Sequence, residues 1–251
     1  MATAKRGSVA DEDKLPHKRQ AKLTSLWGVA VPAAGSSCAA FGGRKSVDVS
    51  GIKGFQYVTE FLPNGACARY YRELAALGDW EYAQVVLMGK PCTMNRMTCS
   101  FSLDGTVKYR YSGVAQKTRP FSASLAVAEL VDAVETMFVK EQDPPVPRIN
   151  YVLLNYYKDG TDSLGLHADA EQDLVGPVYG ISLNQAGDDE SQRRFFDIVE
   201  NETGVKTRLP LDNGSLMVMR SVFQKLYKHG VPEQRRITSG RINLTMRSIR
   251  E

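Results

Sequence analysis

The chain has 251 residues, of which 43% are hydrophobic, and it carries a formal net charge of +4 at pH 7. That length supports one sizeable core, so a second full domain is not expected. No apolar stretch is long enough to span a membrane, and the first residues lack the apolar segment of a secretory signal. The mild positive charge is compatible with nucleic acid but is too weak to indicate it alone.

The four cysteines are irregularly spaced and form no C-x-x-C pair. A disulfide framework or a structural zinc site is therefore not expected. Free thiols of this kind are typical of proteins from a reducing compartment, so we expect an intracellular protein.

Residues 1–50 are predicted to form a disordered tail, because charges, alanine, glycine and serine alternate there without a helical or strand period. Two basic pairs, Lys5-Arg6 and Lys18-Arg19, are followed by Lys22. This split pattern indicates either a nuclear import signal, which would place the protein in the nucleus, or simply a solvated basic tail.

The tail also contains an apolar stub, Gln20–Trp27. It resembles the PCNA-interacting box, in which a glutamine precedes an aliphatic residue and paired aromatics, although Leu26 replaces the first aromatic. A sliding clamp is thus one candidate partner. The alternative is a stub that packs on the folded domain.

The folded domain is predicted to span residues 51–251. In chain order we expect a strand at 58–62, a helix at 66–77, a short apolar strand at 85–88, a strand at 106–111, a helix at 122–140 ended by the prolines of 144–147, and then strands at 151–157, 178–183, 194–199, 205–209, 215–219 and 241–249. Helices that precede a dense series of strands predict an α+β fold, with helices packed on one side of a β-sandwich or barrel.

Both histidines of the folded region belong to one chemical pattern. His167 and Asp169 are two residues apart, so on a strand their side chains would point the same way, and His229 follows on a later segment. Two imidazoles and one carboxylate, with open positions left on the metal, describe the facial triad of non-haem Fe(II) oxygenases. The absence of a third nearby histidine or cysteine argues against catalytic zinc.

A second pattern follows shortly after His229. Residues 241–247 alternate polar and apolar side chains, and the polar face carries Arg241, Asn243, Thr245 and Arg247. Burial of the apolar face would direct two guanidiniums into a cavity, which is costly without an anionic partner. Two arginines match a dicarboxylate such as 2-oxoglutarate.

Taken together, these motifs resemble the AlkB family of Fe(II)/2-oxoglutarate dioxygenases, over roughly residues 54–249. The motifs that carry the resemblance are Asn155-x-Tyr157, Tyr157-Lys-Asp-Gly160, His167-x-Asp169-x-Glu171, His229 and Arg241-x-Asn243-x-Thr245-x-Arg247. The resemblance implies a double-stranded β-helix, a jelly-roll fold. It also implies Fe(II) ligated by His167, Asp169 and His229, with 2-oxoglutarate and O₂ as co-substrates.

The same resemblance implies that Arg241 clamps the distal carboxylate of 2-oxoglutarate and that Arg247 steadies its chelating end. Asn155, Tyr157 and Asn243 would support this binding, and Thr245 belongs to the same polar row.

On the substrate side, Tyr109 and Tyr111 lie two residues apart and are suited to stack an extracted base. The resemblance implies that Tyr111 stacks the flipped base, while Tyr109 works with Glu171, whose carboxylate favours the amino groups of adenine and cytosine. Core packing is the alternative for both tyrosines.

Leu87 and Met88 correspond to an apolar finger that relatives insert into a duplex, although a buried hairpin strand would look the same. Arg96 and the run Gln234-Arg235-Arg236 stand where relatives contact phosphates, and ordinary surface charge is the alternative. Residues of about 80–120 would thus form a nucleotide-recognition region.

These features predict an enzyme that repairs N-alkylated bases, such as 1-methyladenine and 3-methylcytosine, in duplex DNA. The alternatives are an RNA demethylase on the same fold, a dioxygenase acting on protein or lipid, and a non-enzymatic scaffold. We expect a monomer that does not associate with membranes.

Overall fold

The computed structural model describes residues 46–47, 49, 51–87, 89–107, 110–111, 114–115, 117–139 and 147–250. The predicted basic pairs and the stub Gln20–Trp27 therefore lie outside the described residues. None of the described helices combines the length and apolar character needed to cross a bilayer.

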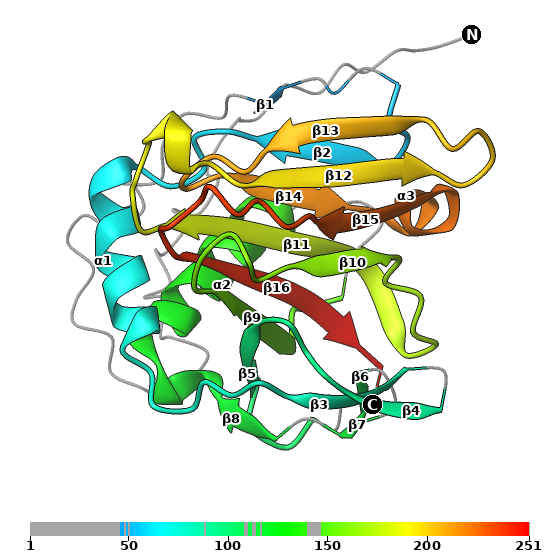
Figure 1. Cartoon of the computed structure of the whole chain (residues 1–251). Helices are drawn as coiled ribbons and strands as arrows, with labels where there is room; N and C mark the ends of the chain where they lie inside the picture. Colours follow the sequence, from blue (N-terminus) through cyan, green and yellow to red (C-terminus); the bar gives the residue numbers. More distant parts are fainter. Residues whose placement is uncertain are drawn as a thin grey trace, which may run out of the picture. The chain divides into compact units, whose positions relative to one another are not determined.

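Two antiparallel layers dominate the described part of the chain (Figure 1). The larger sheet has the strand order β1 (Ser46–Val47), β2 (Phe55–Val58), β14 (Leu216–Met219), β11 (Leu174–Asn184), β16 (Arg241–Ile249), β9 (Tyr151–Tyr157), β5 (Met97–Ser102), β8 (Thr118–Pro120). Its last pair, β5 and β8, is parallel. The smaller sheet has the order β10 (Leu164–His167), β15 (Tyr227–Val231), β12 (Phe195–Glu200), β13 (Lys206–Pro210).

The two sheets face each other across a shared core. Tyr57 and Met217 of the larger sheet pack in one cluster with Phe196 and Ile198 of the smaller sheet. Two short hairpins, β3 (Gln84–Leu87) with β4 (Lys90–Thr93) and β6 (Arg110–Tyr111) with β7 (Val114–Ala115), lie beyond these sheets. This arrangement confirms the predicted two-layer β architecture.

Helices cover the other face of the larger sheet (Figure 1). Helix α1 (Asn64–Ala75) packs against β11, and α2 (Leu125–Phe138) begins where the Ser124 side chain accepts a hydrogen bond from the amide of Val127. The ring of Phe138 lies 6.2 Å from that of Tyr179 in β11. The predicted placement of helices on one side is therefore confirmed.

Strand β16 is buried along its whole length, on both faces. Ile242, Leu244 and Met246 are fully buried, while the alternate residues Arg241 and Arg247 line a pocket between the sheets. The strand pairs with β9 on one side and with β11 on the other. The predicted division into an apolar and a polar face is thus confirmed, and the arginines point inward.

Two predicted strands are wrong in extent. The strand expected at 58–62 ends at Val58, because Phe61 and Leu62 are buried from a turn before α1. Of the described residues in the segment 106–111, which exclude 108 and 109, Arg110–Tyr111 forms a strand and residues 106–107 do not. The carboxylate of Asp104 accepts hydrogen bonds from the amide and hydroxyl of Thr106 and so forms a turn there.

Several elements were not predicted: β1, β4, β5, β7, β8, β10, β15 and the short helix α3 (Ser221–Leu226). Of these, β10 and β15 carry residues that line the pocket between the sheets. Strands β10 and β15 contain glycine and lack clear alternation, so their sequences resemble loops.

Gly160 provides a test of how the loop 232–237 is held. Its amide donates to the Ile237 carbonyl at 2.8 Å, its carbonyl accepts from the Gln234 amide at 2.7 Å, and an added Cβ would overlap the Gln234 carbonyl oxygen. We expect Gly160→Ala to cost about 1–3 kcal/mol of unfolding free energy because the backbone must shift. Gly78→Ala is the control, since its Cβ meets nothing within 4 Å. Equal thermal unfolding midpoints for the two variants would contradict this.

Candidate metal and co-substrate site

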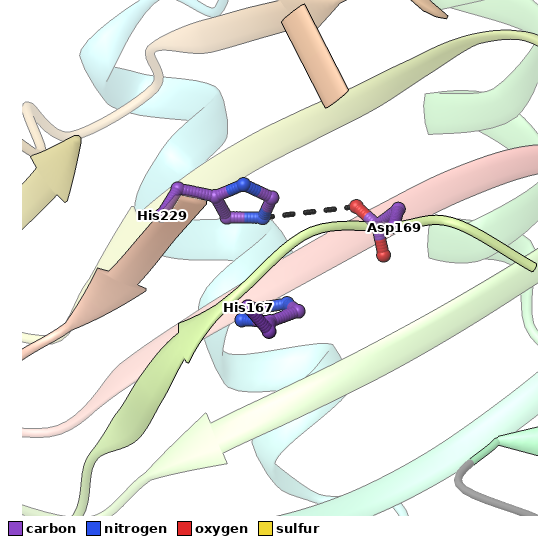
Figure 2. Close-up of side chains that lie close together, drawn as sticks. All are labelled: His167, Asp169 and His229. Atoms are coloured by element: carbon purple, nitrogen blue, oxygen red, sulfur yellow. Dashed lines mark ion pairs between the residues drawn. The ribbon is translucent and has the colours of Figure 1, made fainter. Parts of the chain in front are cut away.

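Three possible metal ligands converge at the edge of the smaller sheet (Figure 2). His167 ends β10 and pairs in register with His229 of β15, so the two rings lie 4.4 Å apart. Asp169 follows β10, and its Oδ2 lies 3.7 Å from His229 Nε2. One ligand atom from each of the three residues lies within 4.8 Å of the others. The predicted convergence of these residues is therefore confirmed.

Asp169 is held as a carboxylate. Burial opposes its charge, but attraction to Arg247 and to the two histidines outweighs burial and lowers the pKa of Asp169 to about 2. Arg247 Nη2 donates to its Oδ1 at 2.7 Å. Gln224 donates to Oδ2 at 3.4 Å and accepts from the Asp169 amide at 3.0 Å. The carboxylate is thus oriented before any metal binds.

Both imidazoles can offer a lone pair. Burial, and secondarily the neighbouring His167, lowers the pKa of His229 to about 3, so its ring is neutral at physiological pH. His167 Nδ1 lies 3.0 Å from the Gly165 carbonyl oxygen. Because a carbonyl only accepts, we assign the proton to Nδ1, which leaves Nε2 of His167 available to a metal.

Arg241 lies deeper in the same pocket. Its Nε donates to Ser182 Oγ at 2.8 Å, and its guanidinium lies 5.3 Å from the ring centroid of Tyr157. Burial lowers the pKa of Arg241 to about 10, so it remains charged at neutral pH. Its Nη1 atom is buried and has no hydrogen-bond partner among the described residues. A buried donor of this kind calls for a hydrogen-bond acceptor, and a carboxylate is the acceptor that a guanidinium binds most strongly.

A polar chain connects the two ends of the pocket. Thr245 donates to Asn243 Oδ1 at 2.8 Å, and Asn155 Nδ2 lies 3.4 Å from the same oxygen. On the other side, Arg96 Nε donates to Asn155 Oδ1 at 2.6 Å. Residues from both sheets complete the wall: Leu153, Leu164, Gly180, Phe196, Met217, Met219 and Val231.

The residues present fit Fe(II) and 2-oxoglutarate. The donor set of two neutral imidazoles and one carboxylate suits Fe(II), and it leaves positions open for further ligands. The unpartnered Nη1 of Arg241 fits one carboxylate of a dicarboxylate, whose other end would reach the metal. Predicted metal ligands and predicted co-substrate residues therefore line a single pocket.

The predicted substrate residues are only partly described. Tyr109 and Met88 lie outside the described residues, and so do the side chains of Leu87 and Tyr111. Glu171 is half-buried, and its Oε2 atom has no hydrogen-bond partner among the described residues. Such an oxygen is free to accept from an amino group.

The predicted phosphate contacts fall into two groups. Arg235 and Arg236 are exposed, and Arg235 forms an ion pair with Glu233. Arg96 is buried, with 4% of its surface exposed, and lines the metal pocket. This location differs from the exposed position that a phosphate contact requires, and it places Arg96 with the co-substrate residues.

Two polar residues that contact charged groups of the site were not predicted. Gln224, on α3, contacts Asp169 but lies 55 positions away in the chain without any motif around it. Ser182 accepts from Arg241. A weak signal for it exists, since Gly180, Ser182 and Asn184 form a row of small and polar residues in an otherwise apolar strand.

Comparison with known proteins agrees with this geometry. Residues 54–247 match the family model described as the 2OG-Fe(II) oxygenase superfamily. The chain is 29% identical to "DNA oxidative demethylase ALKBH2" of Arabidopsis thaliana, over 92% of this chain and 76% of that protein. It is 27% identical to the Mus musculus protein of the same name, over 66% of this chain and 67% of that protein.

Among solved structures, one described as "The structure of OsALKBH1" has a TM-score of 0.49 and 19% identity, covering 78% of this chain and 98% of that chain. The relatives named above bear out the resemblance to AlkB proteins that the motifs indicate. On its matching family model and its converging His-Asp-His cluster, the chain belongs to the 2OG-Fe(II) oxygenase superfamily.

Proposed function

We propose that the protein removes alkyl groups from damaged DNA bases by oxidation, with 1-methyladenine and 3-methylcytosine as its substrates. The observation that carries the proposal is the single pocket that His167, Asp169 and His229 share with Arg241, whose Nη1 has no hydrogen-bond partner among the described residues. DNA is proposed as substrate because the similar Arabidopsis and mouse proteins are named DNA oxidative demethylases.

Fe(II) with 2-oxoglutarate and O₂ would supply oxidation of an otherwise inert N-alkyl carbon. One oxygen atom of O₂ enters succinate as 2-oxoglutarate loses CO₂, and the other forms a hydroxyl group on the alkyl carbon. The C–N bond of this hemiaminal then breaks, and the carbon leaves as an aldehyde. The base nitrogen takes back the electron pair of that bond and is restored.

The protein's own groups bind and orient. His167, Asp169 and His229 hold the metal on one side, so the opposite side is open to co-substrate and substrate. Arg241 anchors one carboxylate of 2-oxoglutarate. Because the molecule is short, this anchor limits where its other, metal-binding end can lie. Arg247 keeps Asp169 charged at physiological pH.

The substrate must leave its helix to reach this pocket, because the atoms under attack are otherwise stacked and paired. We propose that Tyr111 stacks the extracted base and that Glu171, with Tyr109, accepts from its amino group. The buried Oε2 of Glu171, which has no hydrogen-bond partner among the described residues, supports this role. Leu87 and Met88 would fill the gap in the duplex.

A fixed basic loop would hold the nucleic-acid backbone. Arg235 and Arg236 project from a loop that is anchored on both sides, by the hydrogen bonds of Gly160 and by Arg194, which donates to the Pro232 carbonyl at 2.9 Å. Exposed guanidiniums on a rigid loop suit contacts with phosphates, which position the duplex without reading sequence.

In this proposal residues 51–251 form the catalytic domain and residues of about 80–120 its nucleotide-recognition region. The tail's roles, nuclear import and binding of a sliding clamp through Gln20–Trp27, remain proposals from sequence, as does a monomeric state.

Replacing a metal ligand tests the chemistry. His167→Ala should lower succinate release coupled to demethylation of methylated duplex DNA at least about 100-fold, roughly 2.7 kcal/mol of transition-state stabilisation, because the metal loses one ligand. Lys225→Ala, an exposed change on α3, is the control. Activity of His167→Ala equal to that of the control would overturn the assigned metal site.

The predicted finger is tested by comparing repair of duplex DNA with repair of single-stranded DNA. Replacing Leu87 and Met88 together with alanine should reduce repair of methylated duplex DNA several-fold more than repair of the same methylated single strand, since only a duplex leaves a gap to fill. Initial rates on the two DNAs and on methylated RNA make the comparison. Equal losses on both DNA forms would reject the finger, and a preference for RNA would favour an RNA demethylase instead.

The role of the basic loop is tested by the salt dependence of DNA affinity. Arg235→Ala and Arg236→Ala should each weaken DNA binding about equally for all sequences and reduce the slope of log affinity against log salt by about 1, because each removes one phosphate contact. Fluorescence anisotropy at several salt concentrations measures this. An unchanged slope would show that the loop faces away from the nucleic acid.

A further inference from the structure

Arg96 joins the predicted recognition region to the co-substrate pocket. It follows the β3–β4 hairpin directly and precedes β5, yet its side chain lies inside the pocket with Asn155 and Arg241. Only 4% of its surface is exposed. A side chain this deeply buried contacts the inside of the protein rather than a polymer bound at the surface.

One hydrogen bond of Arg96 fixes the orientation of the Asn155 side chain. Its Nε donates to Asn155 Oδ1 at 2.6 Å, which commits the oxygen of the carboxamide to Arg96. The amino group of Asn155 must then point the other way, toward Asn243 Oδ1 and Thr245 Oγ1, at 3.4 and 3.5 Å. Both of these distances are long for hydrogen bonds, so the amino group retains capacity for a shorter bond to a bound anion.

The neighbour of Arg96 fixes its backbone. Asn95 Nδ2 donates to the Thr161 carbonyl and to Ser163 Oγ, each at 3.1 Å, and the Asn95 carbonyl accepts from the Ser163 amide at 3.0 Å. Ser163 immediately precedes β10, the strand that carries His167. The turn that holds Arg96 is therefore tied to the metal-binding strand and is not a freely moving part of the hairpin.

From this geometry we infer that Arg96 is a positioning residue for 2-oxoglutarate: it orients the Asn155 carboxamide so that the amino group faces the co-substrate. It acts through Asn155 and not by contact with nucleic acid. A flipped carboxamide would present an oxygen to an anionic ligand and would repel it, so the orientation set by Arg96 decides the sign of this interaction.

The inference concerns the co-substrate pocket and can be tested without nucleic acid, so it stands or fails separately from the proposed substrate. Isothermal titration calorimetry of 2-oxoglutarate into the full chain loaded with Mn(II) gives the affinity directly. Arg96→Met should weaken binding about tenfold, as expected for loss of a charge-assisted hydrogen bond. Arg72→Met is the matched control, since Arg72 is exposed on α1.

A double-mutant cycle separates action through Asn155 from direct contact. Asn155→Ala should weaken binding of 2-oxoglutarate by itself, and adding Arg96→Met to it should then change the affinity less than twofold, because the group that Arg96 orients is gone. Additive losses would overturn the inference. So would an Arg96→Met affinity equal to that of the control.

Arg96→Lys covers the case in which Arg96→Met does not fold, as judged by its thermal unfolding transition. Lysine keeps the charge but lacks the fixed fork of the guanidinium, so we expect a smaller loss than tenfold but a measurable one. Unchanged 2-oxoglutarate affinity in Arg96→Lys would overturn the inference.

Discussion

The ion pair between Arg247 and Asp169 is the interaction on which the site depends. Both side chains are almost fully buried, and their 2.7 Å contact joins β16 of the larger sheet to the loop after β10 of the smaller one. It keeps the carboxylate charged despite its burial, and it links the metal ligands to the polar row of β16. A buried pair of this kind costs desolvation, which is tolerated here because its members also serve the pocket.

The parts of this fold that follow a simple period could be predicted from sequence. Strands β9 and β16 have the predicted bounds. For β16 the signal is the strict alternation of polar and apolar side chains over residues 241–247. Strands β10 and β15 were missed, although they carry His167 and His229. Each of these short strands contains a glycine, which has no side chain to contribute to an alternating pattern. Segments 164–167 and 227–231 are therefore recognised as strands only by their pairing with neighbouring strands.

The same distinction applies to the site. Residues in spaced motifs, such as His167 and Asp169, were found, whereas Gln224 was not, because its contact with Asp169 depends on how α3 packs. Arg96 illustrates a different point. Its place in the chain predicts a phosphate contact, whereas the structure places its side chain, buried, in the co-substrate pocket. Burial is set by tertiary packing and cannot be read from position in a motif.

The pairing of His167 with His229 across two adjacent strands has a consequence for metal choice. The pairing of β10 with β15 brings the centroids of the two rings within 4.4 Å. A cradle assembled in advance from nitrogen and oxygen donors favours copper, nickel and zinc over ferrous iron, following the intrinsic affinity order of divalent ions. Occupancy by iron would therefore depend on which ions the surroundings make available, together with the ligand types and geometry of the site.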